Sequence, residues 1–180
     1  MTDEKLIEKK LSGKKIFSGR IIDLSVDKVL LPDGKQAERE YVSHRGGASV
    51  LPIDNEQNVY LVRQFRYPYG QILLEIPAGK LEKGEDATIT AARELEEETG
   101  FVGSITPYGV IYPTPGYTDE NLYVFLAKDL KKTHVHLDED EFVDLVKMPI
   151  KTALKKVLNN EIKDAKTCYA LLRYCYENGI

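Results

Sequence analysis

Residues 79–101 read GKLEKGEDATITAARELEEETGF and join a glycine-containing loop to a segment dense in carboxylates. The range 86–99 contains neither glycine nor proline, and Gly100 supplies a stop signal, so the pattern predicts a helix that ends there. At about 100° per residue, three glutamates fall on one arc of this helix, beside an apolar arc. These glutamates are Glu94, Glu97 and Glu98.

Like charges crowded on one arc require compensation. The Glu94–Glu98 pair, four residues apart, destabilises an exposed helix by about 0.2–0.5 kcal/mol. Arg93 precedes Glu97 by four residues and can neutralise one acid, which leaves a surplus for a hard divalent cation. Magnesium is the expected ion, because it binds through one or two carboxylates together with substrate phosphates. Taken alone, the helix could equally present a solvated glutamate-rich face.

The loop and the helix together resemble the Nudix box, G-x5-E-x7-R-E-U-x-E-E-x-G-U. The matching residues are Gly79, Glu85, Arg93, Glu94, Leu95, Glu97, Glu98, Gly100 and Phe101. Phe101 departs from the bulky aliphatic residue that the pattern prefers, which concerns packing rather than chemistry. The chain is therefore similar to the Nudix hydrolases, which cleave nucleoside diphosphates linked to varied groups. The box itself spans residues 79–101 only.

This resemblance implies a fold and a metal site. The implied fold is α/β, an α/β/α sandwich with a mixed sheet, to which the sequence adds a small N-terminal antiparallel β layer. Glu94 and Glu98 are implied to bind Mg²⁺, with Mn²⁺ as a substitute, while Glu97 and the backbone carbonyl of Ala78 complete the cluster. Arg93 is implied to orient the carboxylates, so Arg93 and Glu97 count as catalytic residues.

Short apolar runs predict strands before and after this helix. Val26–Leu31 and Gln36–Val42 flank a Pro-Asp-Gly turn and predict a hairpin of the N-terminal layer. Ala48–Ile53 and Val59–Phe65 flank a polar turn and predict a second hairpin. Further strands are expected at Ile72–Ile76, Ile105–Tyr112, Leu122–Ala127 and Phe142–Met148. We divide the chain into an N-terminal β subdomain at 1–45, expected to form a dimer, and a catalytic domain at 46–180.

Two helices are predicted near the C-terminus. Pro149 can open one that runs through Leu158, and Asp164 can cap the last. The inward stripe of the last helix is expected to hold Ala165, Cys168, Tyr169, Leu172, Cys175 and Tyr176. Its two cysteines lie roughly 10 Å apart along the axis, so free thiols and a cytoplasmic location are expected. Residues 1–12 lack the apolar stretch of a signal peptide.

Segments outside the box resemble the ADP-ribose pyrophosphatase subfamily. Pro115 follows Gly100 by fifteen residues, which matches a proline typical of that subfamily, so Pro115 and Gly116 are candidates for substrate contact. A Pro-Gly pair also serves as an ordinary turn between strands. Glu75–Glu82 resembles the subfamily's entry to the box. Arg39 and Glu40 resemble a pair near the adenine that reaches the partner's site across a dimer, although they read equally as an exposed charge pair.

Two more resemblances concern the diphosphate and the base. Arg66 is similar to an arginine that contacts the diphosphate, a role that suits its bidentate geometry, with Arg63 as the alternative. The acidic run 137–142 resembles a mobile loop that delivers the base, assigned to Glu139, and a further metal ligand, assigned to Glu141. The neighbours Asp138 and Asp140 leave a slip of one position open, and a solvated acidic turn is the alternative.

Composition narrows the class of protein. The 180 residues carry a net charge of −4 with both signs interspersed, which excludes the basic stripe of a nucleic-acid binder. No apolar run is long enough for a membrane span. We expect a homodimeric, magnesium-dependent hydrolase that cleaves ADP-ribose, a small-molecule nucleoside diphosphate, to AMP and ribose 5-phosphate. The alternatives are a broader hydrolase of GDP-mannose, NADH or FAD, and a non-catalytic sensor that binds ADP-ribose.

Overall fold

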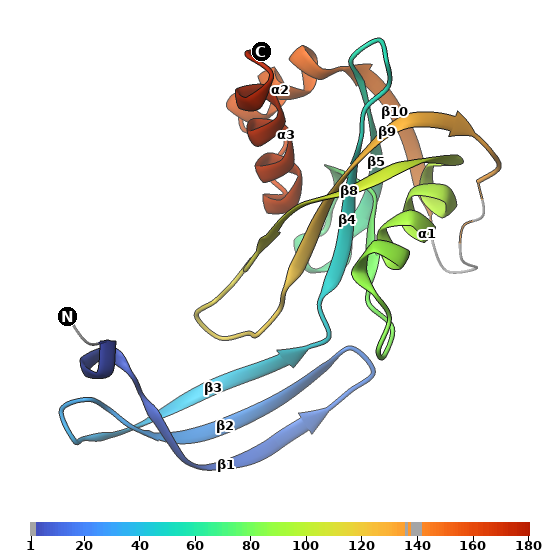
Figure 1. Cartoon of the computed structure of the whole chain (residues 1–180). Helices are drawn as coiled ribbons and strands as arrows, with labels where there is room; N and C mark the ends of the chain where they lie inside the picture. Colours follow the sequence, from blue (N-terminus) through green and yellow to red (C-terminus); the bar gives the residue numbers. More distant parts are fainter. Residues whose placement is uncertain (1–2, 136, 138–141) are drawn as a thin grey trace. The chain divides into compact units, whose positions relative to one another are not determined.

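The computed structural model describes residues 3–135, 137 and 142–180, and its contacts divide the chain into two units (Figure 1). The N-terminal unit consists of Met1–Gly46 and Thr114–Glu120. The main unit consists of Gly47–Pro113 and Asn121–Ile180. A boundary drawn along the sequence assigns the loop Thr114–Glu120 to the second domain, whereas its contacts group it with the first unit.

An antiparallel sheet of order β1-β2-β3 forms the N-terminal unit. The predicted hairpin is confirmed as β2 (Ile22–Leu30) paired with β3 (Gln36–His44). The sequence pattern did not predict β1 (Lys9–Ser18), which follows a short 3-10 helix, η1 (Asp3–Leu6). All ten residues of β1 are exposed, so the strand has no alternation of apolar and polar positions from which to recognise it.

The main unit contains two sheets. One has the order β7-β4-β9-β8 and the other the order β10-β5-β6. Only β4 and β9 run parallel, and every other pairing in the two sheets is antiparallel, so the arrangement is mixed as expected. The bounds are β4 (Gly47–Pro52), β5 (Asn58–Arg66), η2 (Tyr67–Tyr69), β6 (Gln71–Glu75), β7 (Ala78–Lys80), β8 (Phe101–Ile111), β9 (Leu122–Lys132) and β10 (Val143–Pro149).

The prediction of a second hairpin was wrong. β4 and β5 share only an isolated bridge between Ile53 and Val59, and each then enters a different sheet. All six residues of β4 are buried, because β4 has a neighbouring strand on each edge and side chains packed on each face. A two-stranded hairpin could not have buried these residues. The short turn between the strands therefore connects two sheets rather than two partners.

Three helices cover the sheets of the main unit (Figure 1). The predicted acidic helix is confirmed as α1 (Ala87–Thr99), with Asp86 accepting a hydrogen bond from the Thr88 N–H and Gly100 at φ 69° ending it. The other two are α2 (Ile150–Leu158) and α3 (Ala165–Glu177). α1 lies on one side of the strands, and α2 and α3 lie on the other, which is the expected α/β/α sandwich.

Alternating side chains of the central strands supply a core to each helical layer. Val50 of β4 packs with Leu95 of α1, whereas the next residue, Leu51, packs in the cluster that contains Leu171 of α3. Successive residues of a strand point to opposite faces, so one strand serves both cores. Near-complete burial of the cluster that contains Val50 and Leu95 fixes the position of α1 against the sheet. This position determines where the carboxylates of the helix lie.

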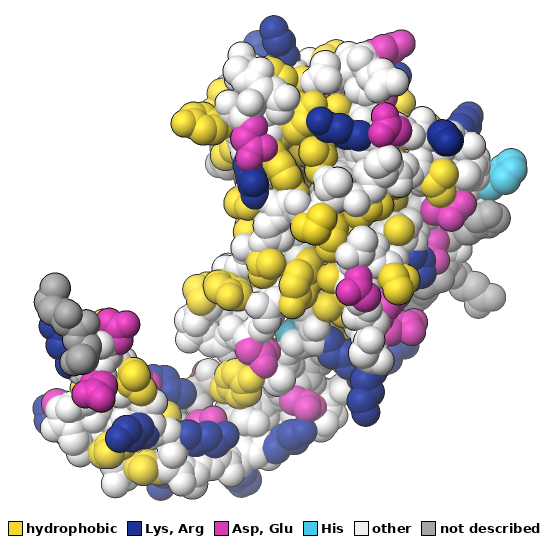
Figure 2. All heavy atoms as spheres, viewed as in Figure 1, with side chains coloured by type: hydrophobic (Ala, Val, Ile, Leu, Met, Phe, Trp, Pro, Cys, Tyr) yellow, Lys and Arg dark blue, Asp and Glu magenta, His cyan; other side chains and the backbone are white. Residues whose placement is uncertain are grey.

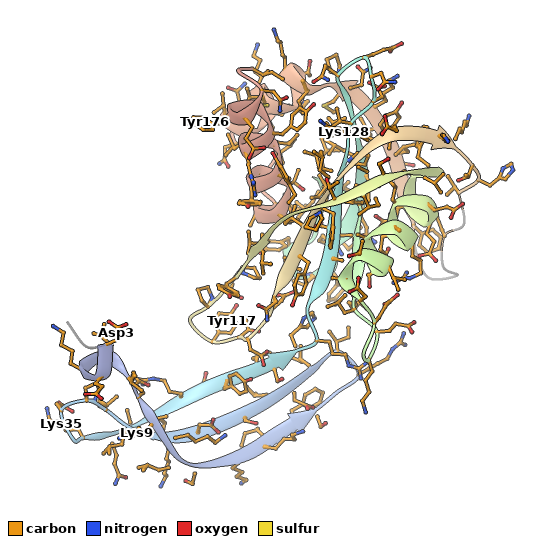
Figure 3. All side chains as sticks on the ribbon, viewed as in Figure 1. Asp3, Lys9, Lys35, Tyr117, Lys128 and Tyr176 are labelled. Atoms are coloured by element: carbon orange, nitrogen blue, oxygen red, sulfur yellow. The ribbon has the colours of Figure 1, made fainter. Side chains whose placement is uncertain are left out.

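The predicted inward stripe of α3 was wrong in part: Cys175 is buried and Cys168 and Tyr169 pack against the core, but the other three predicted residues are exposed. Leu172 is 43% exposed and Tyr176 is 88% exposed, and Tyr176 points into solvent (Figure 3). The buried residues are Lys166, Thr167, Ala170, Leu171, Tyr174 and Cys175. Apolar content alone placed part of the stripe on the exposed side, because two of the inward residues are polar and find partners in the fold. Both cysteines are free thiols, and no helix of the described residues is long and apolar enough to cross a membrane.

Candidate active site

Gly79 lies against the acidic face of α1. A Cβ placed on Gly79 would lie 1.7 Å from Oε1 of Glu94 and 2.1 Å from its Cδ. Glu94 is only 5% exposed, so its carboxylate occupies space that a glycine alone leaves open. Pairing of Gly79 with Ala48 of β4 holds the loop in this place. The first glycine of the box is therefore required by close approach to a box acid.

Glu98 contacts the same short strand. Its Oε2 accepts a hydrogen bond from the Ala78 N–H at 3.0 Å, and the residue is 2% exposed. A carboxylate that accepts from a backbone amide makes a charge-assisted hydrogen bond, which fixes its orientation. Two acids of α1 are thus directed at β7, where the chain leaves one sheet and enters the other.

Arg93 gathers three acids of the box. Its Nη1 lies 2.8 Å from Oε1 of Glu94 and 2.7 Å from Oε2 of Glu97, and its Nε lies 3.6 Å from Oε1 of Glu85. The sequence predicted a contact with Glu97 alone. Partial burial by itself lowers the pKa of Arg93, but the charges of Glu94 and Glu97 outweigh it and raise that pKa. Glu98, which accepts from the Ala78 N–H, adds a fourth carboxylate to this cluster.

This acid cluster has the donor chemistry of a site for a hard divalent cation. It offers carboxylate oxygens, substantial burial, excess negative charge and the close approach at Gly79. Among the described residues, no three acidic, histidine or cysteine side chains have the spacing of a formed metal centre. Arg93 draws Glu94 and Glu97 to itself, while Glu98 is held by Ala78. The residues therefore fit as ligands once the two glutamates turn from the arginine.

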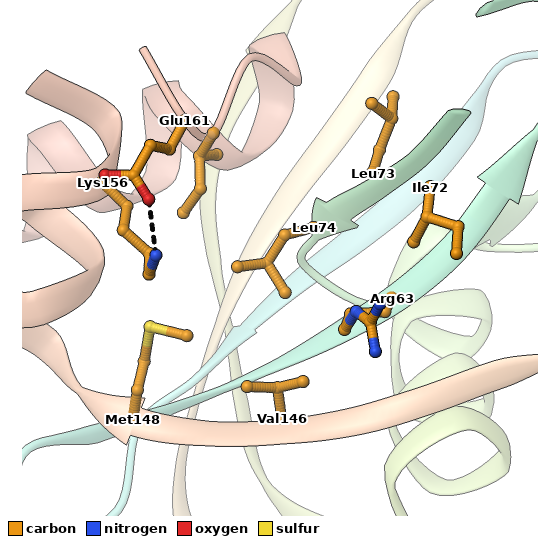
Figure 4. Close-up of a pocket in the computed structure, with 9 residues that line it drawn as sticks. Arg63, Ile72, Leu73, Leu74, Val146, Met148, Lys156 and Glu161 are labelled. Atoms are coloured by element: carbon orange, nitrogen blue, oxygen red, sulfur yellow. Dashed lines mark hydrogen bonds and ion pairs between the residues drawn. The ribbon is translucent and has the colours of Figure 1, made fainter. Parts of the chain in front are cut away.

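The two candidate arginines of β5 lie on opposite faces. Arg66 grips Glu75 with two hydrogen bonds of 2.7 and 2.8 Å, and these bonds, together with the charge of Glu98, raise its pKa. Arg63 pairs with Asp144 at 3.3 Å and lines a cavity of about 360 Å³ on the other face (Figure 4). Positions three apart on a strand face opposite ways. Only Arg66 is directed toward the acid cluster.

A buried ion cluster behind Arg66 was missed by the sequence reasoning. Glu75 is 2% exposed and pairs with Arg66 and Lys166, and Lys166 also contacts Asp164 at 3.0 Å. Burial raises the pKa of Glu75, but the two cations outweigh it and lower that pKa to about 2. One signal was available in the sequence. A lysine in the first turn of a helix opposes the helix dipole and so suggests an acidic partner elsewhere.

Two other predicted substrate residues lie in the N-terminal unit. Arg39 and Glu40 are adjacent and exposed on β3, so their side chains point to opposite faces of the sheet. Arg39 makes an ion pair with Glu8, with 2.9 Å between its Nε and Oε2 of the acid. This contact raises the pKa of Arg39 and ties its guanidinium to another residue of the same unit.

The loop Thr114–Glu120 is fastened to the end of β3. The Val42 N–H donates to the Tyr117 carbonyl at 2.8 Å, and the Asp119 carboxylate accepts from the His44 N–H at 2.8 Å and from the Tyr41 hydroxyl. Pro115 and Gly116 are exposed at its tip, near Tyr117 in the chain (Figure 3). The sequence reasoning gave Asp119 no role, although it is the residue that secures the loop.

The predicted site residues therefore divide between the units. Arg66, Ala78, Arg93 and the box acids belong to the main unit, whereas Arg39, Glu40, Pro115 and Gly116 belong to the N-terminal unit. Glu139 and Glu141, the predicted base and further metal ligand, lie outside the described residues, as do Asp138 and Asp140.

Comparison with protein families and known proteins gives consistent matches. Residues 43–170 match the model of the NUDIX domain, and residues 8–42 match the model of the nucleoside diphosphate sugar hydrolase N-terminal domain. An ADP-ribose pyrophosphatase of Bacillus subtilis is 47% identical over 92% of this chain and 91% of its own length. A methanol dehydrogenase activator of Bacillus methanolicus is 44% identical over 91% of this chain and 90% of its own.

The fold is also shared with a solved structure, the crystal structure of an ADP compounds hydrolase. The two chains superpose with a TM-score of 0.83, covering 96% of each. Sequence identity between them is 20%, so this likeness concerns the fold alone.

Proposed function

Because the chain belongs to the Nudix hydrolase family, we propose that it is a magnesium-dependent pyrophosphohydrolase that cleaves ADP-ribose to AMP and ribose 5-phosphate. The observation that carries the chemistry is the buried acid cluster of α1 against Gly79. The substrate rests on the name of the Bacillus subtilis relative, which matches nearly the whole chain. Members of this family generally use divalent metal ions.

The metal ligands in this proposal are carboxylates of α1 and one backbone oxygen. Glu94, Glu98 and the Ala78 carbonyl hold the ion, with Glu97 beside them and Glu141 as a further ligand. When bound, magnesium stabilises the charge that develops on the diphosphate oxygens. Glu98 is already oriented by the Ala78 N–H, so this ligand needs little rearrangement.

The remaining roles belong to side chains that handle the substrate and the proton. Arg93 restrains Glu94 and Glu97 between turnovers, because it contacts both. Arg66 binds the diphosphate, since its Nη1 makes no hydrogen bond among the described residues. Glu139 accepts the proton of the attacking water. Pro115 and Gly116 contact the substrate from the loop Thr114–Glu120.

We further propose that residues 1–45 form a dimerisation layer and that residues 46–180 form the catalytic domain. Leu11, Ile16 and Phe17 of β1 are 49%, 51% and 54% exposed, and apolar side chains are visible on this unit in Figure 2. A three-stranded sheet with such an exposed apolar surface is stabilised when another protein surface packs against it. In a homodimer, Arg39 and Glu40 would reach the site of the partner subunit.

The dimer is tested by the mass in solution. Light scattering is expected to give twice the 20.4 kDa of one chain, and Phe17→Asp is expected to shift that mass toward one chain by placing a charge in the contact. A mass of one chain at every protein concentration would contradict the dimerisation layer. A cytoplasmic location is part of the same proposal, which the free thiols support and fractionation of cells would test.

The activity is tested with a panel of substrates in the presence and absence of a chelator. ADP-ribose with magnesium is expected to yield AMP and ribose 5-phosphate, and the chelator is expected to abolish both products. Faster cleavage of GDP-mannose, NADH or FAD would favour the broader hydrolase, whereas binding of ADP-ribose without product would favour the sensor. Because one relative is named a methanol dehydrogenase activator, the panel includes the rate of a methanol dehydrogenase with and without this chain.

A further inference from the structure

The first turn of α3 contacts the chain immediately before the Nudix box. Lys166 is 6% exposed, and its Nζ contacts Oε2 of Glu75, ninety-one residues away in sequence. Thr167 is fully buried, and its Oγ1 accepts a hydrogen bond from the Ile76 N–H at 2.8 Å while donating to Asp164 at 2.6 Å. Two consecutive helix residues thus hold Glu75, the last residue of β6, and Ile76, which follows it.

Lys166 controls how much charge Glu75 directs at Arg66. Glu75 uses Oε1 for the Arg66 Nε, and its Oε2 is shared between the Arg66 Nη2 and Lys166. Sharing leaves Arg66 only partly neutralised, so the guanidinium keeps positive charge for an anion. Its side chain is 37% exposed on the edge that Glu75 does not cover. Without Lys166, the full charge of Glu75 would fall on Arg66.

Thr167 acts on the backbone that leads to Glu98. Thr167 accepts a hydrogen bond from the N–H of Ile76, which lies two residues before Ala78. Pro77 lies between them and restricts the backbone conformation there. The Ala78 N–H in turn donates to Glu98 at 3.0 Å. A shift of Ile76 would therefore move the amide that orients a box acid. Burial raises the pKa of Glu75, but the hydrogen bonds and charges of Arg66 and Lys166 lower it to about 2, so Glu75 is charged at neutral pH.

From these contacts we propose that Lys166 and Thr167 are positioning residues, with Lys166 setting the diphosphate affinity of Arg66 and Thr167 setting the placement of Ala78 and Glu98. This inference rests on the proposed function, because it assigns the diphosphate to Arg66. Neither residue touches the substrate in this scheme. The helix that carries them lies on the layer opposite α1, so their effect reaches the acid cluster through Glu75 and Ile76, which they contact directly.

The first experiment measures binding of ADP-ribose by calorimetry in a chelator, where no metal contributes and no hydrolysis occurs. Lys166→Met is expected to weaken the Kd about tenfold, because the full charge of Glu75 would then fall on Arg66 and leave less positive charge for the diphosphate. Lys156→Met is the matched control. Lys156 makes a 2.6 Å ion pair with Glu161 beside the cavity of Figure 4, in the same unit, and its removal is expected to change the Kd less than about twofold.

A double-mutant cycle separates positioning from general destabilisation. In an Arg66→Gln background, Lys166→Met is expected to weaken binding by less than about twofold further, because its route is already removed. An equal loss in both backgrounds, or an unchanged Kd in the single variant, would overturn the role of Lys166. Wild-type protein that binds ADP-ribose but releases no AMP with magnesium would refute the proposed hydrolase, and the cycle would still decide the inference.

The second experiment uses Thr167 and remains decisive if Lys166→Met fails to fold. Thr167→Val removes the hydroxyl at nearly constant volume and is expected to lower kcat about tenfold with little change in KM. Thr167→Ser keeps the hydroxyl and is expected to restore kcat to within about twofold of the wild type. Only the serine variant keeps the hydroxyl that accepts from the Ile76 N–H. Equal kcat values for the valine and serine variants would therefore show that this hydroxyl has no effect on turnover, and would overturn the role of Thr167.

Discussion

Replacement of Glu98 by glutamine is expected to lower the turnover of ADP-ribose by about 10³-fold while the protein stays folded, since a divalent ion contributes several kcal/mol to stabilising the charged transition state. The amide oxygen can still accept the hydrogen bond that the Ala78 N–H now donates to the carboxylate. The local geometry therefore survives, whereas the negative charge that a cation needs is lost. The loss should appear in kcat rather than in the amount of folded protein.

Glu96→Gln is the matched control for this prediction. Glu96 lies on the same helix and is half-buried, but the ion pairs and hydrogen bonds of the box acids do not include it among the described residues. Its substitution is expected to leave kcat within about twofold of the wild type. Kinetics over a range of magnesium concentrations, together with thermal unfolding, provide the measurement. A Glu98→Gln rate within tenfold of the wild type would contradict the metal assignment.

Substitution of Gly79 by alanine is expected to reduce activity by about 10²-fold, because a new methyl group would displace a proposed metal ligand. The Cβ would lie 1.7 Å from Oε1 of Glu94 and 2.7 Å from its Oε2, so the carboxylate must move. The side chain of Glu94 can rotate, and the cost to stability is therefore limited to about 1–3 kcal/mol. Activity should fall far more than stability does.

Gly103→Ala separates these two effects. Gly103 is also on a strand of the main unit, and an added Cβ would lie 2.5 Å from the Lys128 carbonyl oxygen, which is backbone rather than a carboxylate. This variant is expected to lose stability while the folded protein keeps its kcat. Chemical unfolding and initial rates at saturating magnesium distinguish the two variants. Equal ratios of activity loss to stability loss would show that Gly79 has no special relation to Glu94.

The parts of the fold that could be predicted from the sequence are local. The helix α1 was correct with its boundary residues, because Asp86 caps it through a side chain two residues from its partner and Gly100 ends it with a positive φ. The hairpin of β2 and β3 was also correct, because its turn and its alternation lie within one short segment. In each case the interactions that fix the structure join residues a few positions apart.

Predictions that depended on distant partners failed. β4 and β5 follow one another like a hairpin, yet each is paired with strands from far along the chain, since burial on both faces requires neighbours on both edges. The stripe of α3 was assigned to its apolar side chains, whereas the helix buries Lys166 and Thr167 against Glu75 and Ile76. Polar residues on an inward face cannot be recognised until their partners are known.

By itself, the sequence determined the family and the acidic helix with its stop at Gly100, because the Nudix box lies in the contiguous range 79–101 and the spacing of its acids is fixed by helical geometry. Only the tertiary structure decided that Arg66 rather than Arg63 is directed toward the acids, that Glu75 joins Arg66 to Lys166, and that the loop Thr114–Glu120 belongs with the N-terminal unit. Such contacts join residues far apart in the chain. Their stabilisation comes from burial and charge pairing, which exist only after the sheets and helices have packed.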